Sequence, residues 1–309
     1  MVEVEEALLG HVESEAPFVT KAARHLMEAG GKRFRPLLCF LGAETGSGAT
    51  PEVLTAACVV ELTHLASLYH DDVMDEAALR RGAESANARW DNLVAILTGD
   101  FLFAKSSELT ADLGPEAVRI QAQTFSRLVE GQILETLGPG AEDDPLEHYL
   151  RVVAGKTGSL IATSARYGAM FGGATPEVVD ALTEYGERIG VAFQLADDIL
   201  DIASESEESG KTPGTDLREG VPTLPTLYAM RSTDPADARL VELLKQPLTD
   251  DALHAEALGL LRAHPAMDEA RAYVAGEAAA AKELLSVLPE GSARDALEAF
   301  ADVVTDRSS

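Results

Sequence analysis

The chain of 309 residues is short of cysteine and of positive charge, and both shortages narrow what it can be. Its two cysteines, Cys39 and Cys58, lie in separate apolar runs rather than in a CxxC pair, which favours buried free thiols in a reducing compartment. Only 25 Lys and Arg residues stand against 52 Asp and Glu, for a formal net charge of −27. Nucleic acid is therefore not expected as a partner, because proteins that bind its phosphates normally present a basic face.

Signals for strands and for membrane segments are also scarce. Aromatic residues make up 5% of the chain and alternating β-branched runs are absent, whereas Ala, Leu, Glu and Arg recur with a helical period. The acidic N-terminus lacks the basic region of a signal peptide, and no run of about 18 apolar residues is present that would span a membrane. We therefore expect an all-α cytoplasmic protein.

Glycine and proline divide the chain into predicted helices with short connections. Short connections favour antiparallel neighbours in a helical bundle, and no linker is long or polar enough to separate domains. We therefore expect residues 1–309 to form a single domain. The predicted helices lie near residues 4–29, 36–45, 51–80, 86–111, 115–137, 145–171, 176–204, 221–231, 236–245, 249–263, 267–288 and 292–305.

The predicted helix 51–80 ends in an aspartate cluster, HDDVMDEAALRRG, in which Asp71 and Asp75 fall on one face, one turn apart. Like charges at this spacing destabilise a bare helix, and a divalent cation would remove the repulsion. Carboxylate oxygens with room for phosphate oxygens suit Mg²⁺. A solvated acidic helix end explains this stretch alone equally well.

A second cluster, FQLADDILD at residues 193–201, repeats the DDxxD spacing with Asp197, Asp198 and Asp201 after another apolar helical stretch. Two such motifs favour carboxylate clusters facing each other across a helical cavity. With both motifs the chain resembles the trans-isoprenyl diphosphate synthases, or polyprenyl synthetases, of the bacterial medium- or long-chain or geranylgeranyl type. The resemblance implies an all-α, single-domain helical bundle around a central cavity, and a second copy as partner in a homodimer.

The basic clusters extend the resemblance. The segment GGKRFRP, residues 30–36, concentrates positive charge at a helix entrance, where backbone N–H groups also favour an anion, although a solubilising loop has the same composition. In the family this segment is the first motif. The resemblance implies that isopentenyl diphosphate is held by Lys32, Arg35, His64 and Arg81, and that Arg33 faces solvent.

For the allylic prenyl diphosphate, the resemblance implies a separate set of contacts: Arg80, Lys156, Thr157, Gln194 and Lys211. One departure from the family pattern is Val221, which stands where members often carry a second Lys before the TLP sequence.

The reaction implied is a head-to-tail condensation. Several Mg²⁺ ions bridge the allylic diphosphate on Asp71, Asp75, Asp197 and Asp201, while Lys156, Lys211 and Arg80 help to stabilise the departing diphosphate. The isopentenyl double bond attacks the allylic cation, and the proton leaves to the released diphosphate. Asp72 and Asp198 lie about 100° from the metal-facing side of their helices and are expected behind it.

Product length is expected to depend on the residues just before Asp71. In the family, bulky aromatic residues there stop chain growth, and this chain has the small residues Ala66 and Ser67. We expect a product longer than C15, with a C15 or C20 synthase as the alternative and with Tyr69 or Phe125 as candidate floors of the tunnel.

Three other functions remain in competition. A class I terpene cyclase would have no use for a second diphosphate site at GGKRFRP and Arg81. A non-catalytic partner subunit would be expected to lose motif aspartates, and all six remain. A Mg²⁺- or phosphate-binding helical scaffold would bind without turnover. No integral membrane segment is expected, although the lipid product is compatible with a peripheral membrane contact.

Overall fold

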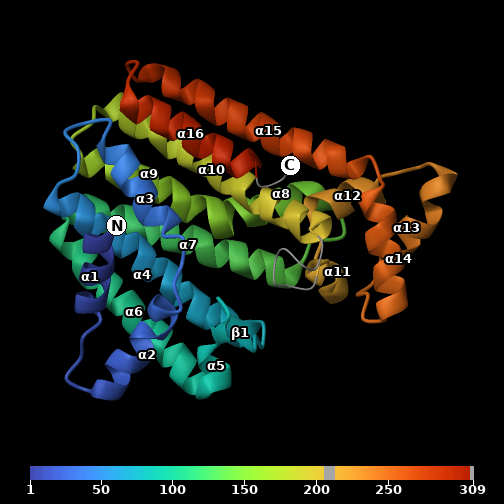
Figure 1. Ribbon diagram of the computed structural model, residues 1–309, viewed down its shortest axis with the longest axis horizontal. Helices are drawn as coiled ribbons and strands as arrows, with labels where there is room; N and C mark the ends of the chain where they lie inside the picture. The colour runs from blue at the N-terminus through green and yellow to red at the C-terminus, as the bar shows by residue number, and fades with distance from the viewer. Residues whose placement is uncertain (205–212, 307–309) are drawn as a thin grey trace. The chain divides into compact units, whose positions relative to one another are not determined.

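The computed structural model describes residues 1–204 and 213–306, and almost all regular structure in them is helical (Figure 1). The all-α prediction is confirmed. The chain divides into two compact units. Unit 1 comprises Met1–Phe125 with Leu160–Thr183, and unit 2 comprises Ser126–Ser159 with Glu184–Ser309.

Unit 1 is organised around a long helix that packs most extensively against one neighbour, α4 against α6. Its core contains Leu62, Leu65 and Tyr69 of α4 together with Leu102 of α6, all fully buried. The elements of this unit are α1 (Val2–His11), α2 (Pro17–Glu28), α3 (Phe34–Ala43), α4 (Pro51–Met74), β1 (Leu79–Arg80), β2 (Ala83–Glu84), α5 (Ala86–Arg89) and α6 (Asn92–Asp112), with the first part of α7 (Pro115–Leu137), most of α9 (Ser159–Phe171) and the start of α10 (Pro176–Ala203).

The helix that carries the first aspartate cluster is shorter than predicted. Thr50 caps its start by accepting a hydrogen bond from the Val53 N–H at 3.2 Å. Its end is a Schellman motif, because Glu76 has φ +49° and the Ala77 N–H donates to the Asp72 carbonyl at 2.9 Å. The prediction of a helix to residue 80 was wrong, since a Glu rather than the usual Gly takes the left-handed position.

The chain that follows α4 forms a two-stranded antiparallel hairpin, in which Leu79 pairs with Glu84 and Arg80 with Ala83. Arg81 and Gly82 form its turn with φ values of +55° and +77°. The hairpin therefore places the Arg-Arg pair on a turn rather than on the helix predicted for it.

α4 is the one helix in the described residues that is long and apolar enough to cross a membrane by length and composition. In its most apolar window, 67% of the residues are buried inside the protein. This degree of burial is that of a core helix.

Three other predicted helices are interrupted. The predicted helix 4–29 is divided before Pro17, which occupies the first turn of α2. The predicted helix 86–111 is divided by Asp91, whose side chain accepts from the Val94 N–H at 2.8 Å and so starts α6. The predicted helix 145–171 contains a π-helical turn, η1 (Ala154–Gly158).

Unit 2 contains the second aspartate cluster near the end of α10. α15 packs against α16 and α12, and the Tyr185 hydroxyl of α10 donates to the Leu297 carbonyl of α16 at 2.7 Å (Figure 1). The remaining elements are α8 (Pro145–Val153), α11 (Thr215–Glu219), α12 (Leu224–Met230), η2 (Pro235–Asp237), α13 (Ala238–Leu243), α14 (Asp251–Arg262), α15 (Ala266–Leu284), η3 (Leu285–Val287) and α16 (Ser292–Asp306).

Both cysteines are free and buried, as predicted. Burial raises the pKa of Cys58 to about 12 and also raises the pKa of Cys39. Neither thiol is therefore a nucleophile at neutral pH.

Candidate functional site

In unit 1, four arginines converge on one histidine of α4. Removal from water lowers the pKa of His64 well below 6.5, and the positive charges of neighbouring arginines lower it further. These neighbours are, in order of effect, Arg35, Arg81, Arg80 and Arg33. The imidazole is therefore neutral at pH 7, inside a group of fixed cations.

Arg35 and Arg81 form the part of this group that lacks a close carboxylate partner among the described ion pairs. Burial lowers the pKa of Arg35 to about 10, with Glu61 opposing the fall and Arg81 adding to it. Burial likewise lowers the pKa of Arg81, although its Nη1 donates to the Leu26 carbonyl at 3.0 Å and to Gly30. Both guanidiniums stay charged at neutral pH, and an anion beside them would relieve their repulsion.

Lys32 is exposed in the loop between α2 and α3. The preceding residue, Gly31, lies close to two of the arginine side chains. A Cβ added to Gly31 would lie 2.8 Å from Arg33 Nη1 and 2.9 Å from Arg81 Nη1. The paired glycines of the GGKRFRP segment thus allow the loop backbone to approach the guanidinium groups closely.

The expectation that Arg33 faces solvent was wrong. Arg33 is 5% exposed, and its Nε lies 2.6 Å from Glu5 Oε1 while its Nη1 lies 3.0 Å from Glu61 Oε1. A further bond runs from Nη2 to the Met27 carbonyl at 3.1 Å. Burial opposes its charge, but Glu5 and Glu61 outweigh burial and raise the pKa of Arg33. Arg33 therefore anchors the loop in the core of unit 1.

The first aspartate cluster keeps the predicted spacing. The Asp75 N–H donates to the Asp71 carbonyl at 2.8 Å, so the two carboxylates are one turn apart. Asp71 is partly buried and Asp75 is exposed. Asp72 is fully buried and accepts a hydrogen bond from Arg80 Nε at 2.6 Å. Burial raises the pKa of Asp72, and the bond from Arg80 opposes the rise.

In unit 2, Asp198 of the second cluster is bonded on both oxygens. The Tyr149 hydroxyl donates to Oδ2, and Gln194 Nε2 donates to Oδ1 at 3.0 Å. Burial raises the pKa of Asp198 to about 7, while the hydrogen bond from Tyr149 opposes the rise. Asp198 therefore points toward α8.

The other aspartates of this cluster lie on the same helix end. Asp197 is partly buried. Asp201 holds the chain that leads into α11, because its carbonyl accepts from the Gly214 N–H at 2.9 Å and its Oδ2 from the Asp216 N–H at 3.4 Å.

Lys156 and Thr157 lie on the π-helical turn η1, a kind of turn often found at functional sites. The turn packs tightly on α7, because a Cβ added to Gly131 of α7 would lie 2.6 Å from the backbone nitrogen of Lys156. Lys156 Nζ bonds Glu135 Oε2 at 2.6 Å, and the Thr157 hydroxyl donates to Gln194 Oε1 at 3.1 Å. The sequence pattern predicted an uninterrupted helix over residues 145–171 and did not indicate this π-helical turn.

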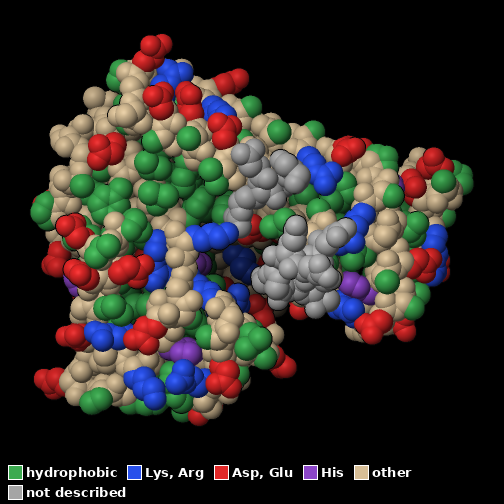
Figure 2. Space-filling view, in the orientation of Figure 1, with side chains coloured by type: hydrophobic (Ala, Val, Ile, Leu, Met, Phe, Trp, Pro, Cys, Tyr) green, Lys and Arg blue, Asp and Glu red, His purple; other side chains and the backbone are tan. Residues whose placement is uncertain are grey.

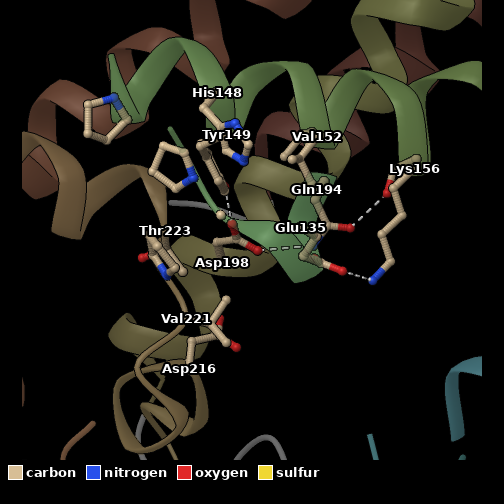
Figure 3. A pocket seen from close by; sticks show the side chains of 16 residues that line it. Glu135, His148, Tyr149, Val152, Lys156, Gln194, Asp198, Asp216, Val221 and Thr223 are labelled. Carbon is tan, nitrogen blue, oxygen red and sulfur yellow. Dashed lines mark hydrogen bonds and ion pairs between the residues drawn. The ribbon is translucent and has the colours of Figure 1, made fainter. Parts of the chain in front are cut away.

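A cavity of about 250 Å³ in unit 2 brings these side chains together (Figure 3). Lys156, Thr157, Gln194 and Asp198 line it beside the apolar side chain of Val221. Tyr149, Glu135 and Asp216 also line the cavity, and no sequence motif had singled out Tyr149 or Glu135.

The predicted metal ligands do not form a metal site by themselves in the described part of the chain. No group of three or more His, Cys, Asp or Glu residues is arranged there to hold a metal ion. Asp71 and Asp75 belong to unit 1, whereas Asp197 and Asp201 belong to unit 2. The donor set of carboxylates nevertheless fits a hard divalent cation. Lys211 lies outside the described residues.

The residues expected to control product length differ in burial. Ala66 is fully buried in the core of unit 1, whereas Ser67 is partly buried and its hydroxyl donates to the His64 carbonyl at 2.8 Å. Tyr69 is fully buried, with its hydroxyl donating to the Ala22 carbonyl at 2.6 Å. The Phe125 ring packs on Phe103 with 4.3 Å between centroids.

The fold has clear counterparts among solved structures. A geranylgeranyl pyrophosphate synthase from Corynebacterium glutamicum, complexed with calcium and isoprenyl diphosphate, is 47% identical with a TM-score of 0.90, covering 100% of this chain and 95% of its own. A decaprenyl diphosphate synthase from Rhodobacter capsulatus is 35% identical with a TM-score of 0.90, over 100% and 96% of the two chains. Fold and site therefore define an all-α enzyme of the isoprenyl synthase type.

Sequence comparison narrows the class to a family. The model described as Polyprenyl synthetase matches residues 16–261, and the chain belongs to this family and is a trans-prenyltransferase. The nonaprenyl diphosphate synthase of Mycobacterium tuberculosis is 56% identical over 284 residues, which cover 92% of this chain and 85% of the relative. The resemblance drawn from the two aspartate motifs is confirmed.

Proposed function

We propose that the protein condenses isopentenyl diphosphate head-to-tail with an allylic diphosphate. The convergence of Arg35, Arg81 and neutral His64 carries the proposal. Neither guanidinium belongs to a described ion pair, and two such cations side by side in a chain of net charge −27 favour an anion site there. Together with exposed Lys32, they would hold isopentenyl diphosphate. A terpene cyclase would have no use for such a second diphosphate site.

The allylic diphosphate is assigned to the residues around the second cluster and to Arg80. Asp71, Asp75, Asp197 and Asp201 would hold Mg²⁺, which would neutralise the charge of this diphosphate. Lys156 and Lys211 would add fixed positive charge, and Thr157 and Gln194 would line the same side. The calcium in the Corynebacterium structure supports a divalent cation in this family.

The chemistry assigned to the side chains is electrostatic. As the allylic C–O bond breaks, its electron pair leaves with the diphosphate, and Lys156 and Arg80 stabilise the negative charge that develops there. The π electrons of the isopentenyl double bond, oriented by Arg35, His64 and Arg81, form the new C–C bond. The proton then passes to the diphosphate released from the allylic substrate. His64 is not assigned as the proton acceptor, because we assign it to the diphosphate group of isopentenyl diphosphate.

We further propose a product longer than C15. Ser67 lies one turn before Asp71 on the same side of α4, and it is small. The nonaprenyl and decaprenyl synthases named above support a long product, whereas the geranylgeranyl synthase of Corynebacterium supports a C20 product as the alternative.

We also propose that the whole chain acts as a single domain within a cytoplasmic homodimer. Leu93, Ile96 and Leu97 at the start of α6 are exposed by 64%, 41% and 56%, and a second copy would cover them. Hydrophobic side chains reach the surface among charged ones on the face drawn in Figure 2. The lipid product also favours a peripheral membrane contact.

Replacing Arg35 by glutamine tests the isopentenyl site. The loss of a charge-assisted contact to a diphosphate, about 1.5–3 kcal/mol, should raise the KM for isopentenyl diphosphate about 10- to 100-fold. The KM for the allylic substrate should stay unchanged. Arg119→Gln removes an arginine that is 71% exposed and should match the parent protein. An unchanged KM for isopentenyl diphosphate in Arg35→Gln would contradict the assignment.

A further inference from the structure

Tyr149 begins a chain of hydrogen bonds that ends beside Lys156 (Figure 3). The Tyr149 hydroxyl, on α8, donates to Asp198 Oδ2 on α10. The other oxygen of the same carboxylate accepts from Gln194 Nε2 at 3.0 Å. The Gln194 carbonyl oxygen in turn accepts from the Thr157 hydroxyl at 3.1 Å. Three elements of unit 2 are thus linked through side chains alone.

The direction of the chain follows from what each group can donate. The Tyr149 hydroxyl and the Gln194 Nε2 both donate to Asp198, whose two carboxylate oxygens are the acceptors. An amide has one donating end and one accepting end, so its oxygen is turned to Thr157 once its nitrogen faces Asp198. Each bond therefore fixes the orientation of the next group along the chain.

Burial makes these bonds consequential. Asp198 is 7% exposed and Thr157 is 8% exposed, so only a small part of either side chain faces the cavity, and a lost partner costs more there than on an exposed surface. Without the Tyr149 hydroxyl, the Asp198 carboxylate loses the contact that sets its plane. Its hold on the Gln194 amide, and through it on Thr157, then loosens.

We propose that Tyr149 is a positioning residue for the allylic substrate, acting through Asp198 to hold Gln194 and the Lys156–Thr157 turn. This inference rests on the proposed function, which assigns Lys156, Thr157 and Gln194 to the allylic side. Tyr149 itself has no contact assigned to either substrate. Its effect therefore falls on allylic binding alone.

The test is the Tyr149→Phe variant, which removes only the hydroxyl. Steady-state rates are measured with farnesyl diphosphate varied at saturating isopentenyl diphosphate, and then with the roles reversed. The KM for farnesyl diphosphate should rise about tenfold, equivalent to about 1.4 kcal/mol, while the KM for isopentenyl diphosphate stays within about twofold.

Tyr185→Phe is the matched control. Tyr185 is fully buried in unit 2, whereas Tyr149 is partly buried. Tyr185 lies on the same helix as Gln194, and its hydroxyl donates to the Leu297 carbonyl at 2.7 Å. Tyr185→Phe also removes one tyrosine hydroxyl and its hydrogen bond, and that bond is the more deeply buried of the two. It should therefore lose at least as much thermal stability as Tyr149→Phe without changing either KM. If Tyr149→Phe does not fold, Thr157→Val, compared with Thr157→Ser, tests the same chain at its other end.

The outcomes separate the inference from the function on which it rests. Equal behaviour of Tyr149→Phe and Tyr185→Phe, or a rise in both KM values, would overturn the positioning role. A rise confined to the KM for isopentenyl diphosphate would overturn the assignment of the allylic substrate to these residues. A parent protein that elongates no primer would overturn the proposed function itself.

Discussion

The buried ion pair between Arg33 and Glu61 allows a sharp prediction of stability. The two side chains are 5% and 2% exposed, and their charged atoms lie 3.0 Å apart. Arg33→Met leaves the Glu61 carboxylate buried without this partner, which costs about 3–5 kcal/mol in comparable cases. Since whole domains are stable by only about 5–15 kcal/mol, the variant should lose a large part of its free energy of unfolding.

Glu5→Gln provides the contrast at the same arginine. Glu5 is 42% exposed, so its contribution is that of a partly solvated pair, about 0.2–1 kcal/mol. The double variant Arg33→Met/Glu61→Met should lose less than the sum of its two single variants, because neither charge is then left buried opposite an empty position.

The assay is urea unfolding followed by tryptophan fluorescence. Trp90 is the single tryptophan and lies in unit 1, with its ring centroid 5.2 Å from that of His25, so its emission reports on the unit that contains the ion pair. A loss below about 1 kcal/mol in Arg33→Met would refute the reasoning, because an exposed pair behaves in that way. A loss in Glu5→Gln as large as in Arg33→Met would refute it as well.

Three further predictions concern protons, charge and thiols. The pKa of His64 falls on folding, so below pH 6.5 the unfolded chain binds a proton that the folded chain does not. As the pH is lowered below 6.5, the free energy of unfolding should therefore fall by up to about 1.4 kcal/mol per pH unit more than in His64→Gln. Parallel pH profiles of the two proteins would contradict this. Val221→Lys adds a cation to the unit 2 cavity and should lower the KM for the allylic substrate about two- to fivefold. The decrease should be smaller at high salt. A KM equal to that of the parent protein at every salt concentration would place Val221 away from the diphosphate. Cys39 and Cys58 should not react with a thiol reagent in the native protein and should both react in guanidinium; fast native labelling would contradict their burial.

Sequence patterns predict those features of the site that depend on residues close together in the sequence. The spacing of Asp71 and Asp75 needs only one helical turn, and it survives although α4 ends at Met74. The end itself was not predictable from the usual signals, because Glu76 takes a backbone conformation that most often belongs to glycine. The hairpin that carries Arg80 and Arg81 begins three residues after this one.

Partners distant in sequence could not be predicted in this way. Arg33 meets Glu5 and Glu61, which lie on two other helices, and nothing in the GGKRFRP segment indicates them. Tyr149 reaches Asp198 in the same way, from one helix to another. Such contacts depend on how helices pack in three dimensions, so a linear motif records one side of each contact at most.

Product analysis tests the central claim most directly. The purified protein is incubated with labelled isopentenyl diphosphate and with dimethylallyl, geranyl, farnesyl or geranylgeranyl diphosphate, in Mg²⁺ or in EDTA, and the dephosphorylated products are sized. We predict a ladder that requires Mg²⁺ and ends beyond C20. A single C15 or C20 product would contradict the long product. No elongation with any primer, as expected of a non-catalytic partner subunit, would contradict the proposed function.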